Sequence, residues 1–136
     1  MFNDLNVKKI LVAIDSSDNS IKAANYSLFL GDKFKAIVIA LYVIPQKGKN
    51  AEEAIQDIQH ILEKIKLDAS LNHVELRTEI IQSESSVINE ITEYAKNTNA
   101  DLLVVGIRAA SEFRFMLGST ASGVISYAHC PVVVVK

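Results

Sequence analysis

The sequence contains one cysteine, two prolines and no tryptophan, and it carries no excess of positive charge. A lone cysteine cannot close an internal disulfide, which favours a reducing compartment. The formal net charge of −2 supplies no basic field that would hold nucleic acid. The apolar runs are far shorter than the roughly 20 residues of a membrane helix, and the N-terminal stretch lacks the parts of a secretory signal. We therefore expect a cytoplasmic protein with no membrane or nucleic-acid partner.

The sequence also lacks a recognisable catalytic or metal-binding arrangement. His60, His73 and His129 are far apart and follow no metal-ligand spacing. Cys130 follows His129 directly, but neighbours in sequence rarely face each other, so this pair does not supply a nucleophile with its base. No P-loop, nucleophile elbow or pair of carboxylates is visible. An enzyme interpretation therefore has no residue to carry the chemistry, and the sequence favours a binding protein over an enzyme.

The apolar segments that are present predict five strands in a single domain of residues 1–136, of which 49% are hydrophobic. Four of them have almost no polar alternation, which is typical of strands covered on both faces of a parallel sheet. The fifth, at 74–81, alternates apolar and polar residues, so we expect it at an edge of the sheet. The continuous segments are 9–14, 36–44, 102–105 and 132–135.

Helical periodicity separates these strands. The first helix, from Asn19 to Leu30, has Gly31 as its expected stop signal. The second follows Asn50 and Glu53, a pair that resembles a capping box. The other two follow Ser86 and Gly118. In the last helix, the spacing places Ala121, Val124, Ile125 and Ala128 on one helical face.

The order of elements is therefore β-α-β-α-β-α-β-α-β. Strict alternation with apolar strands predicts a doubly wound α/β fold, a five-stranded parallel sheet with helices on both faces. Alternation alone leaves the order of the strands in the sheet open. The segment 101–120 joins a buried strand to a helix start through a polar turn, and a helix start of this kind attracts phosphate.

Four segments in this order resemble the universal stress proteins, over essentially the whole chain. They are KILVAIDSSDNS, LLVVGIRAAS, LGSTASGVI and AHCPVVVVK. The resemblance implies the strand order 3-2-1-4-5 of the adenine nucleotide alpha hydrolase-like folds. The chain direction then switches between the first and fourth strands, and ligands in open α/β sheets bind at such a switch point.

The resemblance also implies a site for ATP, ADP or AMP, with Mg²⁺ bound through the nucleotide near Asp15. Asp15 is alternatively a helix N-cap or a turn aspartate. Ser119 and Thr120 would contact phosphate or cap the last helix, and these two roles are compatible. Arg108 would pair with phosphate or remain a solvated loop residue. The implied nucleotide-binding residues are Ala13, Asp15, Val43, Gly106, Arg108, Gly118, Ser119 and Thr120.

One departure from the family pattern leaves a second hypothesis open. The ATP-binding loop of the family reads G-x2-G-x9-G-[ST], whereas here Ala109 replaces the second glycine and the loop is one residue shorter. An alanine forced into a glycine conformation costs on the order of 1 kcal/mol. The first hypothesis is a regulatory nucleotide binder with at most slow ATPase activity. The alternative is a dimeric interaction protein that has lost the nucleotide.

The last strand indicates a partner. Val132 to Val135 are apolar on both faces, yet they are expected at an edge of the sheet, where an unprotected strand invites pairing. Pairing with a second copy across a two-fold axis would cover this edge. We therefore expect a homodimer through Val132–Val135, and a regulatory protein partner that the sequence does not identify.

Overall fold

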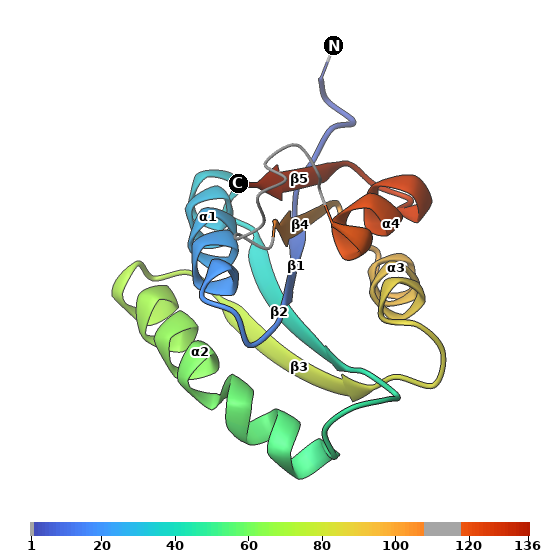
Figure 1. The fold of residues 1–136 in the computed structure, drawn as a ribbon. Coiled ribbons are helices and arrows are strands. Elements are labelled where there is room, and N and C mark those ends of the chain that lie inside the picture. The colour runs from blue at the N-terminus through green and yellow to red at the C-terminus, as the bar shows by residue number, and fades with distance from the viewer. Residues whose placement is uncertain (1, 108–117) are drawn as a thin grey trace.

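The computed structural model describes residues 2–107 and 118–136 and has the predicted alternation of strands and helices (Figure 1). No helix in these residues is long and apolar enough to cross a membrane. The elements are β1 (Lys9–Ile14), α1 (Asn19–Phe34), β2 (Ile37–Ile44), α2 (Ala51–Leu71), β3 (Leu76–Gln82), α3 (Val87–Asn97), β4 (Leu102–Gly106), α4 (Ser119–Tyr127) and β5 (Val132–Val135).

The five strands form one parallel sheet in the order β3-β2-β1-β4-β5, which confirms the doubly wound fold and the implied order. β1 lies in the centre, and Ala13 is in register with Leu41 of β2 on one side and Val105 of β4 on the other. β3 lies at an edge, as its alternating pattern predicted. The chain adds β2 and β3 on one side of β1, and β4 and β5 on the other side. The connections that follow β1 and β4 therefore lead away from each other.

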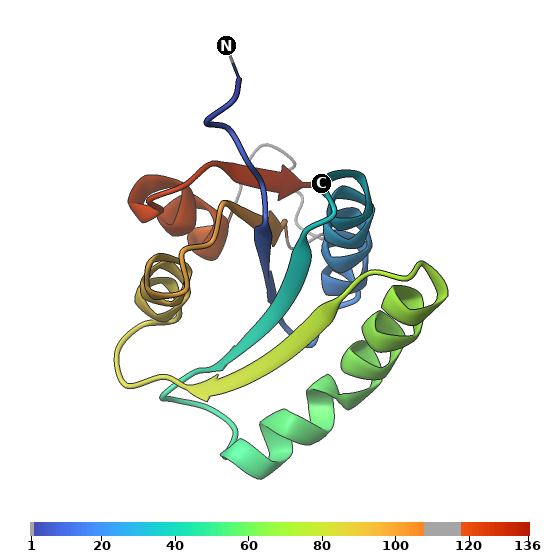
Figure 2. The same cartoon turned by 180° about the vertical axis from the view of Figure 1, so that it is seen from behind.

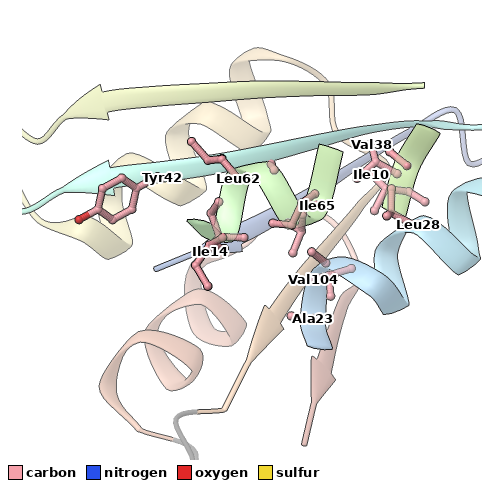
Figure 3. Close-up of a cluster of buried hydrophobic side chains, with 14 of the residues drawn as sticks. Ile10, Ile14, Ala23, Leu28, Val38, Tyr42, Leu62, Ile65 and Val104 are labelled. Atoms are coloured by element: carbon pink, nitrogen blue, oxygen red, sulfur yellow. The ribbon is translucent and has the colours of Figure 1, made fainter. Parts of the chain in front are cut away.

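Two helices cover each face of the sheet. α1 and α2 lie on one face and α3 and α4 on the other, as two views from opposite sides show (Figures 1 and 2). Alternate residues of the same strand enter different cores: Ile10 and Val12 pack with α1 and α2, and Leu11 packs with α3 and α4. Figure 3 shows the first of these cores, in which Ile65 of α2 is fully buried. Burial on both faces is the reason that the strands read as continuous apolar runs.

The prediction that α1 stops at Gly31 is wrong. The helix continues to Phe34, and Lys35 closes it with a left-handed backbone, φ 57°. Gly31 is instead a contact point, because a Cβ at this position would lie 2.8 Å from Cγ2 of Val38. A glycine inside a helix can therefore mark close packing of the helix against a strand, as well as a helix end.

The start of α2 agrees with the predicted capping box. Asn50 Oδ1 accepts a hydrogen bond of 2.9 Å from the backbone N–H of Glu53, and Asn50 Nδ2 donates to Glu53 Oε1 at 2.9 Å. The second bond joins the two side chains, whereas in the usual box the acidic side chain accepts from the backbone. Here only the first bond satisfies a free backbone N–H group, that of Glu53, whereas the usual box satisfies two.

The apolar face predicted for α4 is only partly buried. Ala121 and Val124 are buried, but Ile125 is 44% exposed. The helix packs against α3 through Gly123, where a Cβ would lie 2.3 Å from Cδ1 of Ile88 and 2.9 Å from its Cγ2. This contact fixes the rotation of α4 about its axis, and the rotation leaves Ile125 on the outer side.

The contact between Gly123 and Ile88 leads to a test of packing between α3 and α4. We expect Gly123→Ala to destabilise the fold by about 1 kcal/mol, because overpacking costs about 1–3 kcal/mol and exceeds the gain in helix propensity of about 1 kcal/mol. In an Ile88→Ala background the clash is removed, and the same substitution should stabilise. Urea denaturation of the four proteins measures both effects. The same sign of change in both backgrounds would contradict this account of the contact.

Candidate functional site

A cavity of about 370 Å³ opens at the carboxyl ends of β1, β2 and β4. It lies where the chain direction reverses, because α1 leaves β1 toward one face of the sheet and α4 follows β4 on the other. The structure brings seven of the eight candidate residues to its wall, and the eighth, Arg108, lies outside the described residues. Ala109, the departure from the family pattern, also lies outside them. The seven are Ala13, Asp15, Val43, Gly106, Gly118, Ser119 and Thr120.

Asp15 is a turn aspartate at the mouth of β1. Its Oδ1 accepts hydrogen bonds from the backbone N–H of Ser17 at 2.8 Å, from the Ser17 hydroxyl and from the Ser20 hydroxyl at 3.0 Å. The backbone N–H of Asp15 donates in return to Ser20 Oγ at 2.7 Å. The N-cap of α1 is Asp18, so the N-cap interpretation of Asp15 is wrong. The hydroxyls hold the Asp15 carboxylate at the cavity wall.

The two glycines of the site differ in whether their backbone conformation requires glycine. Gly118 is the N-cap of α4 and has φ 86° and ψ 163°, a backbone region that is nearly restricted to glycine. Ser119 and Thr120 lie in the first helical turn, after the cap, so neither of them is the N-cap. Both side chains are exposed. Gly106 has no such backbone requirement: an added Cβ would lie 3.4 Å from the Asn19 carbonyl oxygen, an ordinary contact.

The N-terminus of α4 forms the anion-attracting side of the cavity. Its first-turn N–H groups point toward the space before the helix, and the helix dipole makes this end positive. The chain just after β4 is tied to α1, because Asn19 Nδ2 donates to the carbonyl oxygen of Ile107. In the described residues, no group of three or more His, Cys, Asp or Glu side chains could hold a metal ion.

On the β2 side of the cavity wall, four polar residues were missed by the sequence analysis. Tyr42 comes from the end of β2, Lys47 and Lys49 from the loop after it, and Asp57 from α2. Lys49 and Asp57 form an ion pair. The two lysines could have been found, since polar residues that follow a buried strand lie at its carboxyl end. Asp57 could not, because it reads as an ordinary residue on the polar face of a helix.

Burial and nearby carboxylates affect the Tyr42 hydroxyl. The pKa of Tyr42 is raised above its usual value first by burial and then by the negative charges of Asp57 and Asp15, while Lys49 opposes the shift. The pKa of Lys49 is raised chiefly by its hydrogen bond to Asp57. Tyr42 therefore keeps its proton, and Lys49 its charge, at neutral pH. The Tyr42 ring packs at the end of the core with its hydroxyl directed away from the neighbouring apolar side chains (Figure 3).

Comparison with known proteins identifies the family. A family model described as the universal stress protein family matches residues 6–136. The chain belongs to the universal stress protein family. Among curated relatives, universal stress protein MJ0531 of Methanocaldococcus jannaschii is 38% identical over 95% of this chain and 82% of its own length. Universal stress protein YxiE of Bacillus subtilis is 31% identical, with both chains fully covered.

Solved structures of universal stress proteins have the same fold as this member. Universal stress protein UspA from Lactobacillus plantarum superposes with a TM-score of 0.78 at 25% identity, covering 96% of this chain and 99% of the other. The universal stress protein from Archaeoglobus fulgidus superposes with a TM-score of 0.81 at 22% identity, covering 99% and 98% of the two chains. The central β1 and the reversal beside β4 are thus features of the family fold.

The two site glycines of this universal stress protein provide a matched pair of substitutions. We expect Gly118→Ala to cost about 1–3 kcal/mol of folding free energy, because alanine is strained at this backbone conformation. Gly106→Ala should be neutral or stabilising by up to about 1 kcal/mol, since its Cβ fits and alanine lowers the entropy of the unfolded chain. Urea denaturation without nucleotide measures both changes. Equal effects of the two substitutions would refute the distinction.

Proposed function

We propose that this universal stress protein is a regulatory module that binds an adenine nucleotide, ATP, ADP or AMP, in the cavity between β1 and β4. The observation that carries the proposal is the convergence of seven described candidate residues on one cavity at the reversal of strand order. These residues come from segments as distant in sequence as Ala13 and Thr120. A volume of about 370 Å³ lies within the usual range for small-molecule sites.

Nucleotides bound to proteins of similar fold support the proposal. A universal stress protein from Archaeoglobus fulgidus was solved in complex with dAMP, with a TM-score of 0.77 at 19% identity. A universal stress protein family protein from Arabidopsis thaliana has AMP bound, with a TM-score of 0.70 at 20% identity. Another universal stress protein was solved in complex with cAMP, with a TM-score of 0.76 at 20% identity. All three ligands contain adenine.

In the proposed complex, the phosphates lie at the N-terminus of α4. Gly118 leaves the approach open, because it has no side chain and its Cβ position has no neighbour within 4 Å among the described residues. Ser119 and Thr120 then offer N–H and hydroxyl donors to phosphate oxygens, and Arg108 would add charge. The base lies on the strand side, between Ala13 and the backbone of Val43. Mg²⁺ would enter with the phosphates, near Asp15, since this ion is commonly bound by substrate phosphates and few carboxylates.

The proposed role is binding with at most slow ATP hydrolysis. Hydrolysis requires a base that activates water within hydrogen-bond reach of the phosphate. The two carboxylates that line the described cavity wall already have partners, since Asp57 pairs with Lys49 and Asp15 accepts a hydrogen bond from Ser17. In this role, the bound nucleotide would alter the contacts of the module with a regulatory protein partner in the cytoplasm.

Thermal stability in the presence of nucleotide tests this function. Millimolar ATP with Mg²⁺ is expected to raise the unfolding midpoint by several degrees, because a ligand at one hundred times its Kd stabilises by about 2.7 kcal/mol. Mg²⁺ alone is the control and should leave the midpoint unchanged. Nucleotide released by heating the purified protein would be independent support. An unchanged midpoint together with a nucleotide-free supernatant would favour the alternative, an interaction protein whose altered loop around Ala109 no longer accepts nucleotide.

We also propose a homodimer through β5, Val132–Val135. β5 is an edge strand, and Val132, Val133 and Val134 are only partly buried. The carbonyl of Pro131 accepts a hydrogen bond from Leu103 of β4, and that of Val135 accepts one from Ile107, directly after β4. Since successive residues of a strand direct their backbone groups to opposite sides, the N–H of Val134 points to the free edge. A second copy of the chain would pair with this edge and cover the valines.

This geometry offers a specific test of the dimer. We expect the wild type to have a dimeric mass in light scattering at micromolar concentration and Val134→Pro to be a monomer, because proline removes the outward N–H and is tolerated on edge strands. Val134→Ala is the control, because it keeps this N–H and should remain dimeric. A monomeric wild type, or a dimeric proline variant, would contradict pairing through β5.

A further inference from the structure

The polar residues on the β2 side of the cavity have no role in the function proposed above. Asp57 and Tyr42 line the cavity there, and the ion pair with Lys49 holds the Asp57 carboxylate through its Oδ2. These residues come from α2, β2 and the loop between them, none of which contributes to the phosphate side. The cavity therefore has two chemically different ends, an N–H-rich end at α4 and an end at α2 where the Asp57 carboxylate is held beside Lys49 and Lys47.

The order of the strands sets the distance between these ends. α4 follows β4, and β4 is separated from β2 by β1 alone. Neighbouring strands lie about 4.8 Å apart, so the two ends are separated by roughly 10 Å across the sheet edge. A nucleoside monophosphate with its phosphate at α4 spans such a distance. Its base then reaches the end of β2, where Tyr42 and Asp57 lie.

The hydrogen-bonding groups of Tyr42 and Asp57 match the edge of adenine better than the corresponding edge of hypoxanthine. An ionised carboxylate only accepts hydrogen bonds, and a protonated tyrosine hydroxyl can donate. Adenine presents an amino donor at position 6 beside a ring-nitrogen acceptor. Hypoxanthine presents the reverse, an oxygen acceptor at position 6 beside an N–H donor. A carboxylate held against the oxygen of hypoxanthine would be repelled, with both acceptors left without a donor.

We propose that Asp57 is a specificity-determining residue that accepts a hydrogen bond from the 6-amino group of adenine, an inference that rests on the proposed nucleotide site. The Tyr42 hydroxyl donates a hydrogen bond beside it. Lys49 is a positioning residue, because its ion pair orients the Asp57 carboxylate. Ala13 and Val43 then enclose the base without reading its edge by a side chain, and Asp57 selects amino purines over oxo purines.

Matched nucleotides and variants test this role. Titration calorimetry of the full chain with AMP and with IMP compares ligands that differ at the 6-position of the base. We expect the wild type to bind AMP about tenfold or more tighter than IMP, a difference of about 1.4 kcal/mol. Asp57→Asn should reduce this ratio below about threefold, because an amide can turn either its oxygen or its NH₂ to the base. Tyr42→Phe should weaken AMP binding while leaving a preference for AMP.

Glu53→Gln is the matched control for loss of charge. Glu53 lies on α2 near Asp57 but outside the cavity wall, and glutamine preserves its capping interaction with Asn50. This variant should keep the AMP preference of the wild type. Circular dichroism and the unfolding midpoint verify that each variant is folded, and the ratio measured on the wild type does not depend on any variant.

The outcomes separate this inference from the function on which it rests. Equal affinity of the wild type for AMP and IMP would overturn the role of Asp57 while leaving nucleotide binding intact. Binding of neither nucleotide would overturn both. If Asp57→Asn leaves the AMP to IMP ratio unchanged but alters the ratio of AMP to dAMP, the carboxylate contacts the ribose, and the inference is wrong.

Discussion

Burial of the parallel sheet on both faces is the constraint on which the rest of this structure depends. Residues of a single strand enter two different cores: Val12 packs with α1 and α2, whereas Leu11 packs with α3 and α4. Helices must therefore cross to both faces. The connection after β1 leads to one face of the sheet, and the connection after β4 leads to the other. Neither of them fills the space between the ends of these two strands. The cavity is a consequence of how the apolar strands are covered.

The same constraint gathers polar groups at one edge of the sheet. The interiors of the strands other than β3 admit almost no polar side chain, so hydroxyl and carboxylate groups occur where these strands end. Asp15 illustrates how such a residue combines structure with chemistry. Its Oδ1 holds the turn through Ser17 and Ser20, and the same bonds fix the carboxylate at the cavity wall. At the opposite side, Gly118 combines a backbone that requires glycine with an open approach to α4.

Much of the fold could be read from local patterns, and the failures have a common cause. The apolar runs identified the strands, the alternation in β3 identified an edge, and Asn50 with Glu53 marked the start of α2. Gly31 and Ile125 were misread because each depends on a contact with a different secondary-structure element. Gly31 allows Val38 to approach closely, and Ile88 against Gly123 sets the rotation that exposes Ile125.

The sequence by itself determined the alternation of elements, the class of fold and, through its resemblance to a family, the seven described residues that line the cavity. These features are encoded locally, in hydrophobic period, capping residues and short motifs. Only the tertiary structure decided that Tyr42 and Asp57 share this cavity. Tyr42 and Asp57 come from a strand and a helix whose relative position depends on packing of α2 against the sheet, and no local pattern specifies such a position. The chemistry of the β2 side is therefore a product of packing, whereas that of the α4 side is already visible in the glycine-serine-threonine turn of Gly118, Ser119 and Thr120.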